Sequence, residues 1–81
     1  MSLAKLLEFR SKLKEASSLL KDAETSIAAM LIIDDYRWLG EVEVLVEKAL
    51  ERIREAKRIG RELTEEVERA LPPEVRELPE D

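Results

Sequence analysis

The sequence predicts an all-α protein in which two long helices form an antiparallel hairpin, and two such hairpins associate into a four-helix bundle. Three observations support this fold class. Apolar residues recur in two runs with alternating steps of three and four, which is the spacing of one helix face. Both runs lose register at the same short segment. Both also carry more apolar side chains than a single neighbouring helix can cover.

The first helix is predicted over residues 2–33. Its apolar face comprises Leu6, Phe9, Leu13, Ala16, Leu20, Ala23, Ile27 and Met30. Ser2 precedes this run and suits an N-cap, because its hydroxyl can accept a hydrogen bond from a free amide of the first turn. A break at Thr25 and Ser26 would give three helices instead of two. The apolar spacing passes through both residues in register, so one continuous helix is favoured.

The second helix is predicted over residues 36–71. Its apolar face comprises Leu39, Val42, Val46, Ala49, Ile53, Ala56, Gly60, Leu63, Val67 and Ala70. Pro72 and Pro73 follow this run, and they stop a helix because proline lacks an amide hydrogen and its ring clashes with the preceding turn.

The bend between the helices is predicted at Asp34 and Asp35. Continuing the first run forward would place Asp34 and Arg37 in the core, and continuing the second run backward would place Asp35 there. Asp35 is the expected N-cap of the second helix, because its carboxylate can accept from free amides of the first turn. A turn at Gly40, with this glycine as C-cap, is the second-ranked alternative.

Residues 1–71 therefore form the predicted helical domain, and residues 72–81 form an acidic, proline-containing tail. The formal net charge of the chain is −5. Residues 64–81 contain seven acids and two arginines, so they account for all of it, and the rest of the chain is neutral.

Self-association is predicted because a chain of 81 residues has a small core and no other support. Cysteine and histidine are both absent, which excludes disulfides, thiolate metal sites and imidazole ligands. A partner chain is the remaining support, and a homodimer is favoured. The expected oligomer interface comprises Leu6, Phe9, Leu13, Leu20, Ile27, Leu45, Ala49, Ile53, Ala56, Gly60 and Leu63.

Composition also indicates habitat and location. Asparagine and glutamine are absent while charged residues make up 41% of the chain, a pattern typical of thermophilic proteins. A designed sequence is the alternative. The chain shows neither a signal peptide at its start nor an apolar run long enough for a membrane span, so a cytoplasmic location is expected.

The predicted function is that of a non-enzymatic interaction or scaffold protein, with no catalytic residue, cofactor site or metal site. Without histidine, a serine or threonine nucleophile would lack its commonest activating base. Two alternatives remain open. The basic stripe Arg54, Lys57, Arg58 and Arg61 lies on one helix face and could contact nucleic acid. The glutamate ladder Glu43, Glu47, Glu51 and Glu55 resembles the helical acid clusters with which MazG-type nucleotide pyrophosphatases bind magnesium, which would imply a metal-dependent nucleotide hydrolase.

Overall fold

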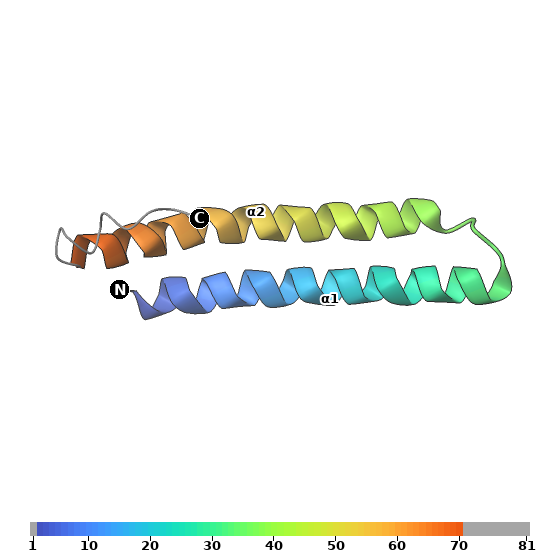
Figure 1. Ribbon diagram of the computed structural model, residues 1–81, viewed down its shortest axis with the longest axis horizontal. Coiled ribbons are helices and arrows are strands. Elements are labelled where there is room, and N and C mark those ends of the chain that lie inside the picture. Colours follow the sequence, from blue (N-terminus) through green and yellow to red (C-terminus); the bar gives the residue numbers. More distant parts are fainter. Residues whose placement is uncertain (1, 71–81) are drawn as a thin grey trace.

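The computed structural model describes residues 2–70 and shows two long antiparallel helices, α1 (Leu3–Ile33) and α2 (Leu39–Ala70) (Figure 1). The radius of gyration is 18.1 Å, whereas a compact chain of this length has about 12 Å. The predicted all-α hairpin is confirmed, and no strand occurs between residues 2 and 70. The predicted helix end at Leu71 and the tail over residues 72–81 lie outside the described residues.

The start of α1 agrees with the prediction. Ser2 is the N-cap with an extended backbone, and its hydroxyl oxygen accepts a hydrogen bond from the Lys5 amide at 3.3 Å. The helix then continues without interruption through Thr25 and Ser26. The alternative with three helices is therefore wrong.

The predicted bend at Asp34 and Asp35 is confirmed. Asp34 adopts the left-handed conformation (φ 54°, ψ 41°), and its amide donates to the Met30 carbonyl oxygen. The Asp35 amide also donates to this oxygen, at 3.2 Å. These bonds satisfy a carbonyl that the end of the helix leaves free, and aspartate tolerates the left-handed conformation better than most residues. Gly40 lies inside α2, so the alternative turn at Gly40 is wrong.

The start of α2 differs from the prediction. The helix begins at Leu39 and not at residue 36, and its first bond runs from the Val42 amide to the Trp38 carbonyl oxygen at 3.1 Å. Asp35 accepts instead from the Arg37 amide at 3.2 Å and from its guanidinium at 2.7 Å. Asp35 therefore closes a turn ahead of α2, and its assignment as the helix N-cap was wrong. The intervening residues are needed to carry the chain sideways from one helix axis to the other.

Half of each predicted apolar face forms the contact between the helices. The buried residues of these lines are Ala16, Ala23 and Met30 on α1, and Val42, Ala49, Ala56 and Leu63 on α2. Four of these seven residues are alanines, which allow the two helices to approach closely.

Most of the other half of each predicted face lies outside this contact, so this part of the prediction was wrong; Leu6 and Gly60 of that half are partly buried. On α1, the positions beside the buried line are Lys5, Lys12, Leu19 and Ser26, in place of Leu6, Leu13, Leu20 and Ile27. On α2, they are Leu45, Arg52, Ile59 and Glu66, in place of Val46, Ile53, Gly60 and Val67. Long charged side chains fit here because their stems cover apolar surface while their ends pair with charges of the opposite helix.

Gly60 lies against the ring of Phe9. A Cβ atom at Gly60 would lie 3.1 Å from Phe9 Cε1, closer than most such contacts. By contrast, a Cβ atom at Gly40 would meet nothing within 4 Å. A glycine inside a helix lowers stability by about 1 kcal/mol relative to alanine. At Gly60 the missing side chain leaves room for the Phe9 ring.

The two helical glycines provide a matched test of this packing. Gly60→Leu is expected to lower the free energy of unfolding by about 1 to 3 kcal/mol, because the new side chain displaces Phe9. Gly40→Leu is expected to raise it by up to about 1 kcal/mol through helix propensity alone. Urea denaturation of both variants checks the pair, and equal effects would contradict the proximity of Phe9 and Gly60.

Candidate interaction surface

One long side of the hairpin is polar and cross-linked by ion pairs between the helices. Lys12 Nζ lies 2.8 Å from Glu55 Oε2, and Lys5 Nζ lies 2.9 Å from Glu66 Oε1. Arg52 binds Glu15 of α1 at 3.0 Å and Glu55 of its own helix at 2.9 Å. A further contact of 3.5 Å joins Lys5 to Glu62. These pairs fix the register in which α1 lies against α2.

The ion pairs also shift the ionisation of their members. The hydrogen bond from Lys12 lowers the pKa of the Glu55 carboxyl, and the same bond raises the pKa of Lys12. The Lys5–Glu66 bond acts in the same way, lowering the pKa of Glu66 and raising that of Lys5. In each pair the folded state therefore favours the charged forms of both partners.

The opposite side of the hairpin carries two lines of large apolar side chains. We define the apolar strip of α1 as Leu6, Leu13, Leu20 and Ile27, and the apolar strip of α2 as Leu39, Val46, Ile53 and Val67. Leu6 is partly buried, and the other seven side chains are 39 to 56% exposed. Successive members are seven residues apart within each helix, except that Gly60 interrupts the second strip. Each strip therefore forms a nearly continuous apolar ridge.

Both strips lie on the same side of the hairpin. Each strip residue stands four positions after the buried line of its helix, as in Ala16 and Leu20, or Ala49 and Ile53. Four residues rotate a position by about 40° around the helix axis from the buried line. Because the two helices are antiparallel, this rotation brings both strips to the same side of the hairpin. The contact of Phe9 with Gly60 agrees, because Gly60 occupies the strip line of α2 and lies against a residue of α1. We call the two strips together the apolar face.

The hairpin leaves most of its large apolar side chains in contact with solvent. Within residues 2–70, sixteen large apolar side chains are at least 39% exposed, whereas only eight residues are buried and four of these are alanines. Full burial of one large aliphatic side chain contributes about 1.5 to 3 kcal/mol. Large contiguous apolar surfaces are typical of interaction sites, so the apolar face is the candidate interaction surface of the described residues.

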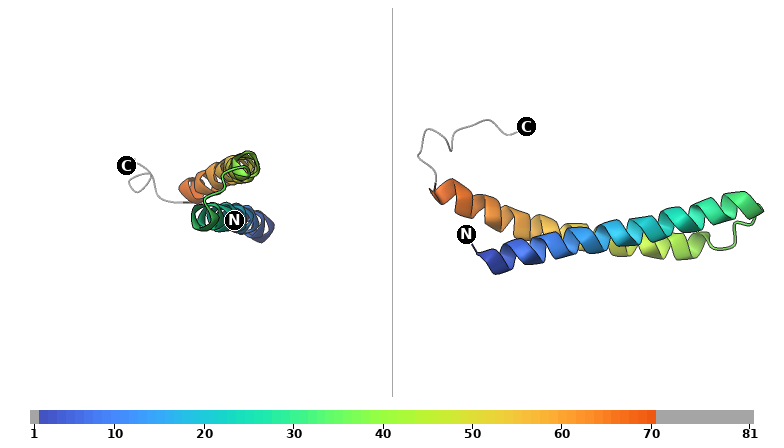
Figure 2. Two further views of the ribbon diagram at one scale, coloured as in Figure 1. Left: turned by 90° about the vertical axis from the view of Figure 1, so that its right-hand side faces the viewer. Right: turned by 90° about the horizontal axis from the view of Figure 1, so that it is seen from below.

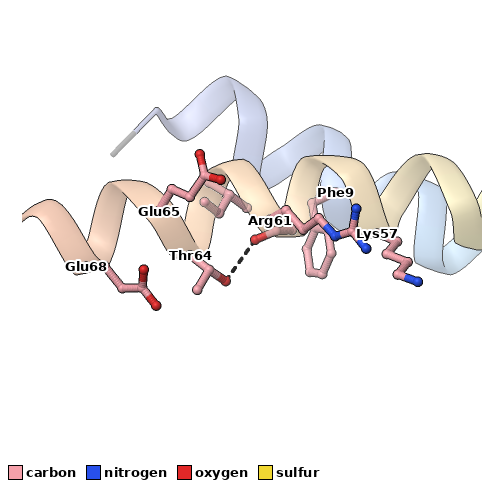
Figure 3. A pocket seen from close by; sticks show the side chains of 8 residues that line it. Phe9, Lys57, Arg61, Thr64, Glu65 and Glu68 are labelled. Carbon is pink, nitrogen blue, oxygen red and sulfur yellow. Dashed lines mark hydrogen bonds between the residues drawn. The ribbon is translucent and has the colours of Figure 1, made fainter. Parts of the chain in front are cut away.

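A hollow of about 620 Å³ borders the apolar face at Gly60 (Figure 3). Phe9 of α1 and Gly60 are among its lining residues, and all of the lining except Phe9 comes from α2. The lining residues also include Lys57, Arg61, Leu63, Thr64, Glu65 and Glu68. The hollow exists because Gly60 has no side chain and because the helix axes are inclined to each other (Figure 2). Its lining combines apolar residues with charged ones of both signs.

Arg54, Arg58 and Arg61 of the basic stripe lie on the outward side of α2, and Lys57 lies between them and the apolar face. Arg54, Lys57, Arg58 and Arg61 are all exposed, and none of them forms an ion pair with another described residue. Acidic residues Glu51 and Glu65 flank the stripe along the helix. The stripe is thus a short positive patch between acidic segments.

The glutamate ladder is divided by the fold. Glu55 faces α1 and binds Lys12 and Arg52, whereas Glu43, Glu47 and Glu51 are exposed to solvent. Among the described residues, no group of three or more acidic side chains is placed to hold a metal ion. Neither described helix has a stretch long and apolar enough to span a bilayer.

The residues predicted for the oligomer interface fall into two groups. Leu6, Leu13, Leu20, Ile27 and Ile53 lie on the apolar face, where a second chain could contact them. Ala49, Ala56 and Leu63 are already buried against α1 of the same chain, and Phe9, Leu45 and Gly60 are partly buried. Sequence reasoning did not assign Leu19 and Ile59 to the contact within the hairpin, although both are apolar. It missed the charged contact residues because lysine and arginine at a packed position break the apolar pattern.

The chain matches no protein-family model, no curated protein and no solved structure.

The ion pairs predict a pH window of stability. The lowered pKa values of Glu55 and Glu66 stabilise the fold above about pH 4.5, the usual glutamate value, and this contribution is lost as pH falls through the lowered values. The raised pKa values of Lys5 and Lys12 stabilise it below about pH 10.5, and this contribution is lost as pH rises through them. The melting temperature at fixed protein concentration is expected to be highest between these limits.

The paired substitutions Lys12→Gln and Glu55→Gln provide the control for this window. The double variant is expected to show a smaller decline at both acidic and alkaline pH, because one charge pair between the helices is gone. A decline of the wild-type melting temperature that begins near pH 7 would contradict the assignment.

Proposed function

We propose that this chain is a non-enzymatic, self-associating helical module, in which two hairpins pack their apolar faces together into a four-helix bundle. The single observation that carries the proposal is the apolar face itself. Its strips and the buried lines form the regular apolar pattern of each helix, yet the partner helix of the same chain covers only the buried lines. In a four-helix bundle the apolar pattern of each helix points to the bundle axis, between two neighbouring helices.

The exposed area is sufficient for a stable dimer. Seven exposed strip residues and three adjacent leucines are each 39 to 69% exposed. Together they expose on the order of 800 Å² of apolar surface, which is close to the area that each partner of a stable interface buries. The three leucines are Leu3, Leu31 and Leu50. The unusually charged composition without asparagine and glutamine fits the same module working in a thermophile.

Dilution and a charged substitution on the apolar face test the proposal. The wild-type chain is expected to be dimeric at micromolar concentration by light scattering and to dissociate on dilution. Leu20→Lys is expected to raise the Kd at least about a hundredfold, because a charge would be buried without a partner. Leu7→Lys is the matched control, since Leu7 is 55% exposed on the outward side of α1.

Circular dichroism of both variants at high concentration separates loss of dimer from loss of helix. A wild-type chain that stays folded and monomeric across a hundredfold range of concentration would overturn the proposal. Equal weakening by both substitutions would show that the contact does not use the apolar face.

The second candidate function is contact with a nucleic acid through the basic stripe. It is favoured by one observation, that none of its four bases is paired with another residue of the range 2–70. The combined substitutions Arg54→Glu and Arg58→Glu are expected to abolish binding of a fluorescent oligonucleotide at low salt, since phosphate contacts supply most non-specific affinity. Lys14→Glu with Lys21→Glu, on the outward side of α1, is the control of equal charge change. Absence of binding by the wild-type chain, or equal loss in both variants, would contradict this candidate.

A further inference from the structure

We infer that the second copy lies with its bend at the opposite end of the bundle, related by a two-fold axis that crosses the helices at the level of Ser17 and Leu50. This inference rests on the proposed self-association and specifies its geometry. It comes from the residues bordering the apolar face, which we call the rims. The rim of α1 is Leu3, Arg10, Ser17, Glu24 and Leu31, and the rim of α2 is Glu43, Leu50, Lys57 and Thr64.

The rims lie where a second hairpin would make its outer contacts. Rim residues are seven apart and stand one position after the buried line of each helix, as in Ala16 and Ser17, or Ala49 and Leu50. This places them just outside the strips on the same side of the hairpin. All are exposed, and none of the four charged members forms an ion pair within the described part of the chain. Their charges are therefore available to a partner.

The rim of α1 is complementary to itself in the antiparallel direction. Arg10 and Glu24 stand seven residues before and after Ser17, and Leu3 and Leu31 stand fourteen residues before and after it. When α1 packs antiparallel against α1 of a second copy about an axis at Ser17, each Arg10 meets a Glu24 and each Leu3 meets a Leu31. One rim thus supplies two ion pairs and two apolar contacts.

The rim of α2 has the same property about Leu50. Glu43 and Lys57 stand seven residues before and after Leu50, so antiparallel pairing of α2 with α2 of the second copy brings each Glu43 to a Lys57. The hollow at Gly60 would then face the partner near its Leu39, whose side chain is 56% exposed. The second rim therefore adds two more ion pairs and an apolar centre.

The two rims require the same axis, and most of the ion pairs between the helices place the two centres at about the same level. Glu15 binds Arg52 at 3.0 Å. Because the helices are antiparallel, Ser17, two residues after Glu15, lies at the level of Leu50, two residues before Arg52. A single two-fold axis perpendicular to the helices can therefore pass both centres.

The opposite arrangement, with both bends at one end, brings like charges together. Its two-fold axis runs along the bundle, so α1 would pack against α2 of the partner at unchanged levels. Lys12 binds Glu55 at 2.8 Å, which places Arg10 at the level of Lys57. By the same register Glu24 lies at the level of Glu43. Juxtaposed like charges oppose association, so the rims select one arrangement and disfavour the other.

Charge reversal distinguishes the arrangements by the sign of its effect. With the bends at opposite ends, Arg10→Glu at low salt is expected to raise the dimer Kd about 5- to 30-fold, because two ion pairs become repulsions. Combining Arg10→Glu with Glu24→Arg is expected to restore the Kd to within about threefold. With both bends at one end, Arg10→Glu would face Lys57 and lower the Kd. Lys14→Glu, with the same charge change away from the rim, is the control.

Cross-linking through introduced cysteines locates the axis directly. Because the chain has no cysteine of its own, each introduced thiol is the only reactive one. Ser17→Cys and Leu50→Cys are each expected to give covalent homodimers with a short thiol-reactive cross-linker. An equimolar mixture of the two variants is expected to give no link between position 17 of one copy and position 50 of another. A dimeric chain that forms only this mixed link would overturn the inferred axis while leaving self-association intact. A chain that is monomeric by light scattering would overturn both.

Discussion

The contact between the helices depends on four alanines. Ala16, Ala23, Ala49 and Ala56 are only 1 to 3% exposed and allow the helices to lie close together. An alanine contributes one buried methyl group, worth about 0.8 kcal/mol, whereas a leucine contributes up to about 3 kcal/mol. The close contact is therefore well packed but supplies little hydrophobic stabilisation. Met30, Val42, Ile59 and Leu63 are the larger side chains buried with them, and most other large apolar side chains lie at the edge of the contact or beyond it.

This arrangement divides the hairpin into two chemically different sides. Along one edge, Lys5, Lys12 and Arg52 form ion pairs with glutamates of the opposite helix. The other edge carries the apolar strips, which no described element covers. Ion pairs on an exposed surface contribute little to stability, but their geometry restricts which residues can lie opposite one another. The polar edge thus restricts the register within a chain, and the apolar edge is the surface available to the proposed contact between chains.

The proposed pairing separates stabilisation from specificity in the same way. Apolar area drives association without direction, since any arrangement that covers both strips buries a similar area. The rim charges supply the direction, because they alternate in sign about Ser17 on α1 and about Leu50 on α2. A small number of charges can thereby favour one of two arrangements that hydrophobic burial alone would leave nearly equal in free energy.

The sequence by itself determined the two helices, the bend at Asp34 and Asp35 and the N-cap at Ser2, since these depend on local spacing and capping chemistry. It did not determine the start of α2 at Leu39 or the cap that Asp34 forms at the end of α1. It did not determine which half of each apolar run faces the neighbouring helix. Leu20 and Leu19 are equally apolar, and only the tertiary structure shows Leu19 partly buried and Leu20 exposed. The rotation of each helix about its axis depends on the packing of both helices together. The alanines permit close approach, and Lys12 forms an ion pair with Glu55 of the opposite helix. The spacing of the rim charges is also visible in the sequence. The arrangement of two copies that these charges favour could be inferred only from the register of α1 against α2.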